Sequence, residues 1–380
     1  MYDVVIVGAR CAGSPLAMHL AKKGHQVLLI DRATFPSDTM STHFIQLPGM
    51  ARLKSWGLVD RVFETDCPPI KGATLDIEGQ VIDVEFPPLE GVPGLAAPRR
   101  TVFDEILVKA AVDAGAELRE GVSVDSLRFG GDRVAGIEGH TSEGPFTADA
   151  RFVVGADGRN SIVAREVGAE YVRYYEPQTS GYYSYYSGVD VSATELYLND
   201  ETIGVSFPTN DGLTVVAVEW TNSRFGELKK DIEGNFLAAV DRFGTLGERV
   251  RAGARAERFV GAADIPLFLR EMHGAGWALC GDACYHKDPA PADGISDAFR
   301  AADLLSAALD EVLSNDASED EVLAACQQQC LDAALPTLEA TARMVSIELP
   351  ATDRATAFIE IRSSDLEEAT SVISARDPAA

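Results

Sequence analysis

The sequence predicts an α/β protein in which a nucleotide-binding fold is interrupted by an antiparallel sheet domain and followed by a helical segment. Residues 2–32 (YDVVIVGARCAGSPLAMHLAKKGHQVLLIDR) run from an apolar strand through a glycine-containing turn and a helix to a second apolar strand, which is typical of a βαβ unit. Residues 172–264 lack this rhythm and contain short alternating segments such as LTVVAVEW. Residues 277–296 return to a strand, a glycine- and proline-rich loop and a helix. The first and last of these regions are therefore expected to close on one ligand.

The segments between these regions carry weaker but consistent signals. Alternating residues on both sides of Glu78-Gly79 predict a hairpin over 73–86, because this dipeptide suits a tight turn. Helical spacing continues from about 297 onward, with an acidic break at 314–320. The remaining predicted elements are a helix over 48–64 broken at Gly57, a helix over 99–118 that Gly115 caps, and strands over 121–129, 133–138 and 146–154.

Composition limits the class of protein. A chain of 380 residues with 46% hydrophobic content can form two core-bearing units. The formal net charge of −26 disfavours binding to nucleic acids and to anionic membranes. No apolar run approaches the roughly 18 to 20 residues of a membrane span, and the N-terminus begins with a strand and lacks a signal-peptide pattern. We therefore expect a cytoplasmic monomer or homodimer without membrane insertion.

The cysteine pattern gives no support for a metal site. Two pairs have CxxxC spacing, whereas zinc sites usually use CxxC pairs or paired histidines. In a reducing cytoplasm we expect free thiols and no structural metal. The six cysteines are Cys11, Cys67, Cys280, Cys284, Cys326 and Cys330.

The first turn resembles a dinucleotide-binding fingerprint with one altered position. Gly8 permits a tight turn out of the strand, and Gly13 lets the helix pack close to the sheet. The free N–H groups at the start of this helix suit a pyrophosphate. Arg10 stands where glycine is usual, so its side chain must swing aside. Asp31 ends the second strand at the spacing expected of a carboxylate on ribose hydroxyls.

Two distant motifs strengthen this interpretation. VVGADGRNS (153–161) ends a strand in Asp157-Gly158, and WALCGDACYHKDPAPADGIS (277–296) ends one in Gly281-Asp282 before Gly294 opens a helix. In this order, the three motifs resemble those of the FAD-dependent aromatic hydroxylases, the superfamily of para-hydroxybenzoate hydroxylase, to which geranylgeranyl reductases and flavin halogenases are related. The GxRxxG spelling and FPSDTMSTHFI (35–45) look like one branch of it.

The resemblance implies a Rossmann-like FAD-binding domain interrupted by a substrate-binding antiparallel sheet domain. The FAD-binding domain would comprise residues 1–71, 98–171 and 265–315, and the sheet domain residues 72–97 and 172–264. Residues 316–380 would form the helical C-terminal segment.

The resemblance also implies the residues that contact noncovalent FAD. Gly8 and Gly13 would hold the pyrophosphate, with Arg10, Cys11 and Ala12 between them, and Asp31 with Arg32 would lie at the adenosine ribose. Arg100 would lie near the pyrophosphate, Val124 beside the adenine, and Asp157 in a motif linked to both FAD and the nicotinamide cofactor. Gly281 and Asp282 would grip the ribityl chain, Pro289 would lie over the flavin edge, and Gly294, Ile295 and Ser296 near the flavin carbonyl.

The activity implied is that of a monooxygenase. NADPH or NADH would reduce the flavin, O2 would form a flavin hydroperoxide, and one oxygen atom would hydroxylate an aromatic or polycyclic small molecule. No catalytic side chain is assigned. His43 and His286 lie in flavin-associated motifs, and each is expected to hydrogen-bond a loop. Alternation places Tyr183 and Tyr185 on one strand face and Tyr182 and Tyr186 on the other, where either pair could line the substrate site or simply pack.

Three alternatives have distinguishable signatures. An FAD-dependent reductase of a prenyl chain or another C=C bond often carries a cysteine motif where this chain has TMSTHF. A flavin halogenase would need a WxWxIP element, which is absent, and its lysine is not identified. A prenyl-binding escort protein without flavin would have little reason to keep Asp157 and Asp282. The substrate, its site of reaction and the choice between NADPH and NADH stay open.

Overall fold

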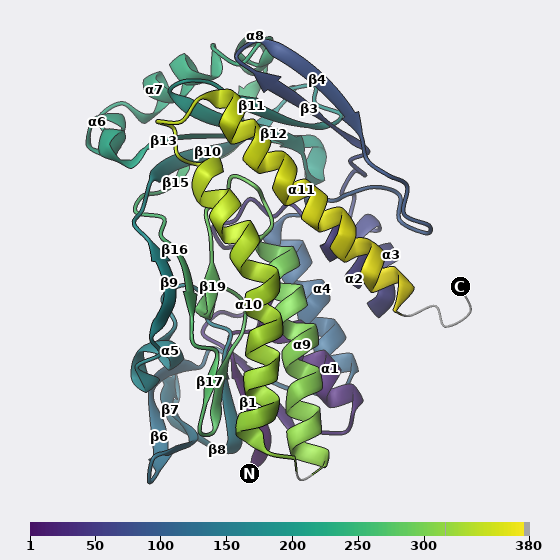
Figure 1. Cartoon of the computed structure of the whole chain (residues 1–380), viewed down its shortest axis with the longest axis vertical. Coiled ribbons are helices and arrows are strands. Elements are labelled where there is room, and N and C mark those ends of the chain that lie inside the picture. Colours follow the sequence, from purple (N-terminus) through teal and green to yellow (C-terminus); the bar gives the residue numbers. More distant parts are fainter. Residues whose placement is uncertain (316, 376–380) are drawn as a thin grey trace.

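The computed structural model describes residues 1–315 and 317–375 and confirms the predicted fold class (Figure 1). Its lower half is built on a mainly parallel sheet with the order β17-β18-β8-β1-β2-β5. Val4–Val7 and Val27–Ile30 are buried, as expected of parallel strands covered on both faces. The elements of this half are β1 (Tyr2–Val7), α1 (Gly13–Lys22), β2 (Val27–Asp31), α2 (Leu47–Trp56), α3 (Val59–Phe63), α4 (Arg100–Asp113), β5 (Glu117–Glu120), β6 (Ser123–Gly130), β7 (Arg133–Thr141), β8 (Gly144–Gly155), α5 (Ile162–Val167), β17 (His273–Gly274), β18 (Trp277–Leu279) and α9 (Gly294–Ser314).

The upper half is a second, largely antiparallel sheet with the order β14-β10-β13-β12-β11-β3-β4, and β15 also pairs with β10. The predicted hairpin forms at Glu78 and Gly79, whose φ angles are 52° and 86°, and it joins this sheet because β3 pairs in parallel with β11. The strands are β3 (Gly72–Ile77), β4 (Gln80–Glu85), β10 (Thr179–Ser187), β11 (Thr194–Leu198), β12 (Thr202–Pro208), β13 (Leu213–Thr221), β14 (Ala254–Arg255) and β15 (Val260–Ala262).

Residues 172–264, which the sequence predicts to contain strands only, also contain three α-helices: α6 (Phe225–Leu228), α7 (Ile232–Val240) and α8 (Leu246–Ala252). The side chain of Asp231 caps α7 by accepting a hydrogen bond from the Gly234 N–H at 2.9 Å. Phe236 of α7 packs on Tyr186 of β10, with ring centroids 6.4 Å apart. These helices therefore cover the outer face of the sheet, a role that the strand pattern did not reveal.

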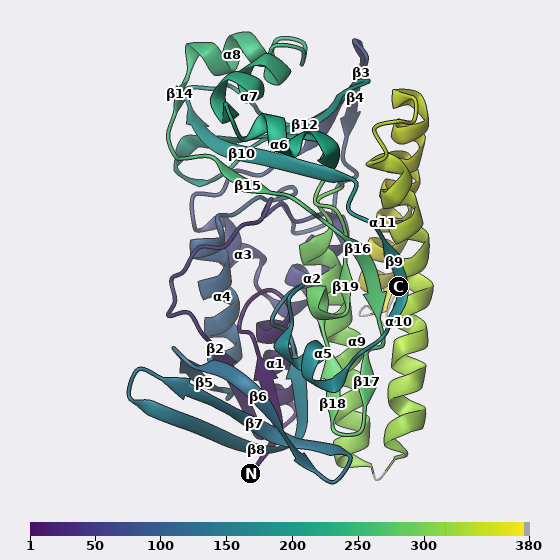
Figure 2. The ribbon, with the colours of Figure 1, turned by 90° about the vertical axis from the view of Figure 1, so that its left-hand side faces the viewer.

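The C-terminal helices connect the two halves (Figure 2). α10 (Glu319–Met344) packs against α9 and α11, and α11 (Ala351–Ser374) contacts α2 below and the strands β3 and β11 above. A small sheet of β9 (Tyr171–Tyr175), β16 (Leu267–Arg270) and β19 (Tyr285–His286) lies along the same side. The predicted helical tail and its break are confirmed, although residue 316 of the break lies outside the described residues.

Candidate functional site

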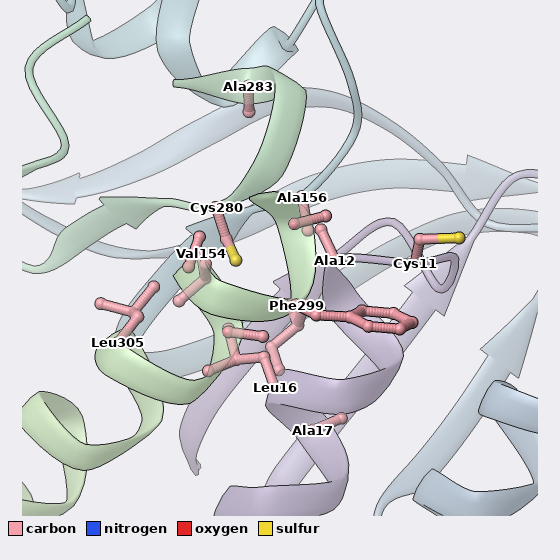
Figure 3. Packing of buried hydrophobic residues seen from close by; sticks show 14 of the residues in the cluster. Cys11, Ala12, Leu16, Ala17, Val154, Ala156, Cys280, Ala283, Phe299 and Leu305 are labelled. Carbon is pink, nitrogen blue, oxygen red and sulfur yellow. The ribbon is translucent and has the colours of Figure 1, made fainter. Parts of the chain in front are cut away.

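The three predicted loops meet at the ends of the parallel strands. Gly8, with φ of 105°, leaves no room for a side chain, because a Cβ there would lie 2.3 Å from the Ala156 carbonyl oxygen. A Cβ on Gly13 would lie 1.8 Å from the Gly8 carbonyl oxygen, and one on Gly281 would lie 2.7 Å from the Ala12 Cβ. Close backbone approach therefore joins segments that are far apart in sequence. Figure 3 shows Ala12, Ala156 and the neighbouring buried side chains in contact at this point.

Arg10 turns away from the loop that contains it. Its guanidinium donates to the Ser37 carbonyl oxygen at 3.1 Å and to the Ser37 hydroxyl at 3.0 Å, and it lies 5.3 Å from the centre of the Phe35 ring. It also pairs with the carboxylate of Asp104 on α4. The side chain thus swings aside as expected from the sequence, and its charge is used to join the first loop to 35–38 and to α4.

Asp104 also holds Arg100, the first residue of α4. Arg100 donates from Nε and a terminal nitrogen to the two Asp104 oxygens, at 2.8 and 3.0 Å. Cys11 is buried against the same carboxylate, with Sγ 3.5 Å from an Asp104 oxygen. Burial raises the pKa of Cys11 far above its usual range, so its thiol is un-ionised.

Asp282 is a half-buried carboxylate surrounded by basic groups. Burial raises its pKa, and His286, Arg100 and Arg159 act in the opposite direction. Within the described residues no protein group forms a hydrogen bond with its carboxylate. Asp282 therefore keeps its full capacity to accept hydrogen bonds from a ligand's hydroxyl groups.

Asp157 has a similar unfilled acceptor. One oxygen accepts the Ile162 N–H at 2.7 Å, at the start of α5, whereas Oδ1 is buried without a partner. Burial raises the pKa of this carboxyl group, whereas hydrogen bonding to the Ser161 side chain and to the Ile162 N–H lowers it. Because buried polar atoms are normally satisfied, the free Oδ1 fits a site that a ligand or water completes.

Asp31 stabilises the first glycine turn, a role that the sequence did not indicate. Its oxygens accept the Ala9 and Ala33 N–H groups, both at 2.8 Å, so it fixes the first glycine turn. The Val122 N–H donates to the Asp31 carbonyl oxygen at 3.0 Å, which brings the start of β6 beside this residue. Val124 follows on β6 and is half-buried, and Arg32 is exposed.

The last motif forms a loop that leads into α9. Pro289 is half-buried, Gly294 is exposed, and Ile295 and Ser296 are buried. The Ser296 hydroxyl oxygen has no hydrogen-bond partner. Asp293 precedes α9 without capping it through its side chain, so the N–H groups of the first turn are free for a ligand.

An ion-pair network that sequence reasoning missed holds this loop. Lys287 is buried and lies 3.1 Å from Asp293 and 2.9 Å from Asp297. Arg362 of α11 also pairs with Asp293, and Arg300 of α9 with Asp297. The alternating charges in KDPAPADGISD were the available signal, but their partners on α11 were not visible in the sequence.

The tyrosines of β10 lie as alternation predicted. Tyr182 and Tyr186 face the covering helices and stack on Phe225 and Phe236. Tyr183 and Tyr185 lie on the opposite face, which we call the inner face. By the strand register, the same face also carries Thr179, Val205, Ala217 and Glu219. Tyr183, Val205 and Ala217 form one row across three strands and are all half-exposed, so this row is accessible to solvent.

His43 connects the inner face to the lower half of the protein, which is built on the parallel sheet. The imidazole Nδ1 lies 3.1 Å from the Ala97 carbonyl oxygen, and Nε2 lies 3.1 Å from the Tyr185 hydroxyl. A carbonyl oxygen only accepts, so Nδ1 carries the proton and the Tyr185 hydroxyl donates to Nε2. Burial lowers the pKa of His43 to about 3, which keeps it neutral. The expected loop hydrogen bond is confirmed for His43 and also for His286, whose Nδ1 lies 2.6 Å from the Pro266 carbonyl oxygen.

A pocket of about 700 Å³ adjoins Asp157-Gly158. Arg159, Arg165 and Arg270 contribute positive charge to its wall, and Tyr171 contributes an aromatic ring. Its other lining residues are Asn160, Ser161, Ala164, Gly168, Ala169 and Glu170. On a chain with a net charge of −26, the wall of this pocket is locally positive, because its three arginines outnumber the one glutamate.

The six cysteines are buried and free of disulfides. Residues 1–315 and 317–375 contain no group of three or more His, Cys, Asp or Glu side chains placed to bind a metal ion. Their helices include none with the length and apolar character needed to cross a bilayer.

Converging glycine loops, free helix-terminal N–H groups and unfilled carboxylate acceptors define a dinucleotide-binding protein. The comparisons with known proteins are specific about the family. A family model described as "FAD binding domain" matches residues 1–341, and the chain therefore belongs to this family. The orphaned Asp157 and Ser296 oxygens and the unpartnered Asp282 fit a ligand with the phosphate and hydroxyl groups of FAD.

Relatives with different activities resemble this chain. It is 24% identical over 348 residues to a 1H-pyrrole-2-carbonyl-[peptidyl-carrier protein] chlorinase of Pseudomonas fluorescens, covering 83% of this chain and 77% of the relative. It is 26% identical over 324 residues to a digeranylgeranylglycerophospholipid reductase of Methanosarcina acetivorans, covering 83% and 76%. It is 30% identical over 171 residues to a 12-dehydrotetracycline 5-monooxygenase/anhydrotetracycline 6-monooxygenase of Streptomyces rimosus, covering 45% and 33%.

Solved structures share the fold over nearly the whole chain. The flavin-dependent brominase Bmp2 matches with a TM-score of 0.83 and 18% identity, covering 98% of both chains. PqsL of Pseudomonas aeruginosa, described as a probable FAD-dependent monooxygenase, matches with a TM-score of 0.81 and 18% identity, covering 94% of this chain and 99% of that one. At such identities the likeness shows the fold alone.

Proposed function

We propose that this protein is an FAD-dependent monooxygenase that uses NADPH or NADH and O2 to hydroxylate an aromatic or polycyclic small molecule. One observation carries the proposal: the inner face of the sheet, with its accessible row and its tyrosines, contacts the segments that flank the cofactor loops. Tyr185 donates to His43, and Thr179 donates to Asp288, directly before Pro289. A substrate on the inner face would therefore lie beside the flavin edge.

The residues that would hold FAD follow from the geometry and from the family resemblance. Bound there, FAD would supply electron transfer and activation of O2. The backbone N–H groups of Ala12 and Gly13 would bind the pyrophosphate, with Gly8 leaving room for it and Arg100 close by, and Asp31 would bind the ribose. Asp282 would accept from the ribityl hydroxyls, Val124 would border the adenine, and the 289–296 segment the flavin ring.

The inner face would orient an aromatic substrate. Aromatic rings can stack or meet edge-to-face with Tyr183, and its hydroxyl can hydrogen-bond a phenol. Burial raises the pKa of Tyr183 and of Tyr185, so both hydroxyls stay protonated near neutral pH. The neutral His43 fixes the Tyr185 hydroxyl direction by accepting its hydrogen bond.

The arginine-lined pocket supports a reduced nicotinamide nucleotide as the electron donor. Its phosphates carry several negative charges, which the acidic surface would otherwise repel. Arg159 and Arg165 form no ion pair in the described residues, so their charges are available to a transient ligand. Arg159 also acts electrostatically on Asp282, which supports a nucleotide in this pocket close to the proposed flavin.

Two other reactions remain as alternatives because relatives perform them. Reduction of a C=C bond is favoured by the likeness to the Methanosarcina reductase, and halogenation by the likeness to the chlorinase. The one buried lysine in the described residues, Lys287, is held between two carboxylates. It is therefore unavailable to activate a halogenating species, and the WxWxIP element is absent.

The deciding experiment is product analysis under labelled O2. Purified protein with FAD, NADPH or NADH, bromide and a panel of phenols and polyketides is incubated under ¹⁸O2, and the products are examined by mass spectrometry. Incorporation of one labelled oxygen atom supports the proposal. Gain of two hydrogens without label would establish the reductase alternative, and incorporation of bromine would establish halogenation. Nucleotide oxidation alone is not decisive, because an uncoupled flavin yields hydrogen peroxide.

A further inference from the structure

Glu219 is a carboxylic acid buried on the inner face of the sheet. It is 8% exposed and lies opposite Gly181 of β10. A Cβ on Gly181 would lie 2.8 Å from the Glu219 Cγ, so glycine at this position leaves the space that the glutamate side chain fills. The strand is thus built to accommodate a carboxyl group that the sequence pattern did not single out.

Asp288 lies next to Glu219 and belongs to the loop that leads into α9 of the lower half. Asp288 is 1% exposed and stands between β19 and Pro289. It accepts hydrogen bonds from the Thr179 hydroxyl and from the Ala290 N–H, the latter at 2.9 Å. Thr179, the donor to Asp288, lies on the inner face two residues from Gly181, the position opposite Glu219. The two carboxyl groups therefore lie close together and interact electrostatically. The pair therefore bridges the sheet and the 287–293 loop.

In the described part of the chain Glu219 has no basic partner, because the charged group that acts on it is Asp288. The one basic group there that acts strongly on the pair is His286 of β19, which acts to lower the pKa of Asp288 while burial raises it. The neighbouring Lys287 is engaged with Asp293 and Asp297. Two adjacent carboxylates in such surroundings cannot both be ionised at low cost.

The hydrogen bonding indicates which group keeps the proton. Thr179 and Ala290 donate to Asp288 and stabilise its anion, whereas Glu219 Oε2 is buried without any partner. Burial, and then the charge of Asp288, raise the pKa of Glu219 well above its usual range. A proton on Glu219 supplies the donor that the pair lacks.

We propose that Glu219 is protonated in the folded protein and that its hydrogen bond to Asp288 docks the 287–293 loop onto the inner face of the sheet. Glu219 is thus a positioning residue for the loop that carries Pro289. The shared proton does not depend on the proposed function, and only its effect on flavin binding rests on the proposed function.

The proposal fixes the sign of a pH dependence. The folded state binds a proton that an unfolded glutamate releases near its ordinary pKa of 4.5. The stabilisation is therefore complete below that value and is lost as pH rises toward the raised folded pKa. Across this window the unfolding equilibrium constant should increase about tenfold per pH unit from this group.

The test uses the apo form of the full chain, so that it does not depend on activity. The wild type, Glu219→Gln, Asp288→Asn and the control Glu195→Gln are compared by infrared spectroscopy and by denaturant unfolding from about pH 5 to about pH 9. Glu195 lies on the same sheet but is paired with Arg249. The spectrum of Glu219→Gln should lack one band of a protonated buried carboxyl group that is present in the wild type and in Glu195→Gln. Bands from other buried carboxyl groups with raised pKa values are common to all three proteins and cancel in the difference spectra.

Glutamine imitates the protonated acid, because its amide donates to Asp288 at any pH. Glu219→Gln should therefore keep the low-pH affinity for FAD while losing the wild-type decline of affinity and stability at higher pH. An unchanged band or an unchanged pH slope in this variant would overturn the proposal. If the variant does not fold, Asp288→Asn decides: it removes the negative charge beside Glu219, so the band should disappear at a lower pH than in the wild type, and an unchanged pH of disappearance would overturn the proposal. Failure of every variant to bind FAD, with the band lost as expected, would refute the proposed function and support the shared proton.

Discussion

Replacing Asp282 with asparagine tests the proposed cofactor site at its least ambiguous position. Asp282 has no hydrogen-bond partner in the described residues and lies among Arg100, His286 and Arg159. Asparagine keeps the size of the side chain but removes the charge and one acceptor. Since no protein hydrogen bond is lost, the variant should fold, and the main effect should fall on ligand binding.

The size of the effect follows from one charge-assisted hydrogen bond. Such a bond contributes about 1.5 to 3 kcal/mol, so the dissociation constant for FAD should rise about 10- to 150-fold. At an FAD concentration about 100 times the wild-type constant, FAD should stabilise the wild type by about 2.7 kcal/mol. The same concentration should stabilise Asp282→Asn by about 1.4 kcal/mol or less.

The assay is titration of apo-protein with FAD, followed by flavin fluorescence and by thermal unfolding. Asp125→Asn is a matched control, because Asp125 is an exposed carboxylate that pairs with His140 on β7. Asp297 is unsuitable as a control, since it is bound to Lys287 and Arg300 and also acts on Asp282. Equal FAD dissociation constants for Asp282→Asn and Asp125→Asn would refute the ribityl assignment.

Three further changes test other parts of the molecule. Tyr185→Phe removes the partner of a buried imidazole and should lower the free energy of unfolding by about 1 to 3 kcal/mol, whereas Tyr186→Phe on the outer face should cost less. Equal losses in denaturant unfolding would contradict a stabilising hydrogen bond between Tyr185 and His43. Gly13→Ala should abolish FAD retention after purification, because its Cβ would lie 1.8 Å from a carbonyl oxygen. Arg165→Gln should raise the KM for NADPH or NADH several-fold at unchanged FAD affinity, and an equal rise for Arg173→Gln, outside the pocket, would exclude the pocket as the nucleotide site.

Several features of this protein were determined by residues close together in sequence. The βαβ unit, the Glu78-Gly79 hairpin and the opposite faces of Tyr183 and Tyr186 all follow from hydrophobic period and turn chemistry. These depend on neighbours within a few residues, so they could be predicted from the chain alone. The outward turn of Arg10 was also predictable, because a side chain has no space inside a pyrophosphate loop.

Local patterns failed where a stronger tertiary contact was decisive. The helices over 225–252 were missed because the preceding strands set the expectation for the whole block, whereas Phe236 and Val240 needed the outer face of the sheet to bury them. Asp31 was expected to face only a ribose, yet it also accepts the Ala9 N–H. Neither contact leaves a periodic trace in the sequence.

Only the tertiary structure decided which charges are paired and which are left free. Lys287 and Arg362 both pair with Asp293 because α11 packs against the lower half of the protein. Glu219 interacts with Asp288 because the antiparallel sheet packs against the 287–293 loop. The sequence alone determined that loops suited to a dinucleotide would form. The protonation and free hydrogen-bonding capacity of Glu219, Asp157 and Asp282 were decided by the fold, because burial and electrostatic interactions depend on distances in space that separation along the chain does not specify.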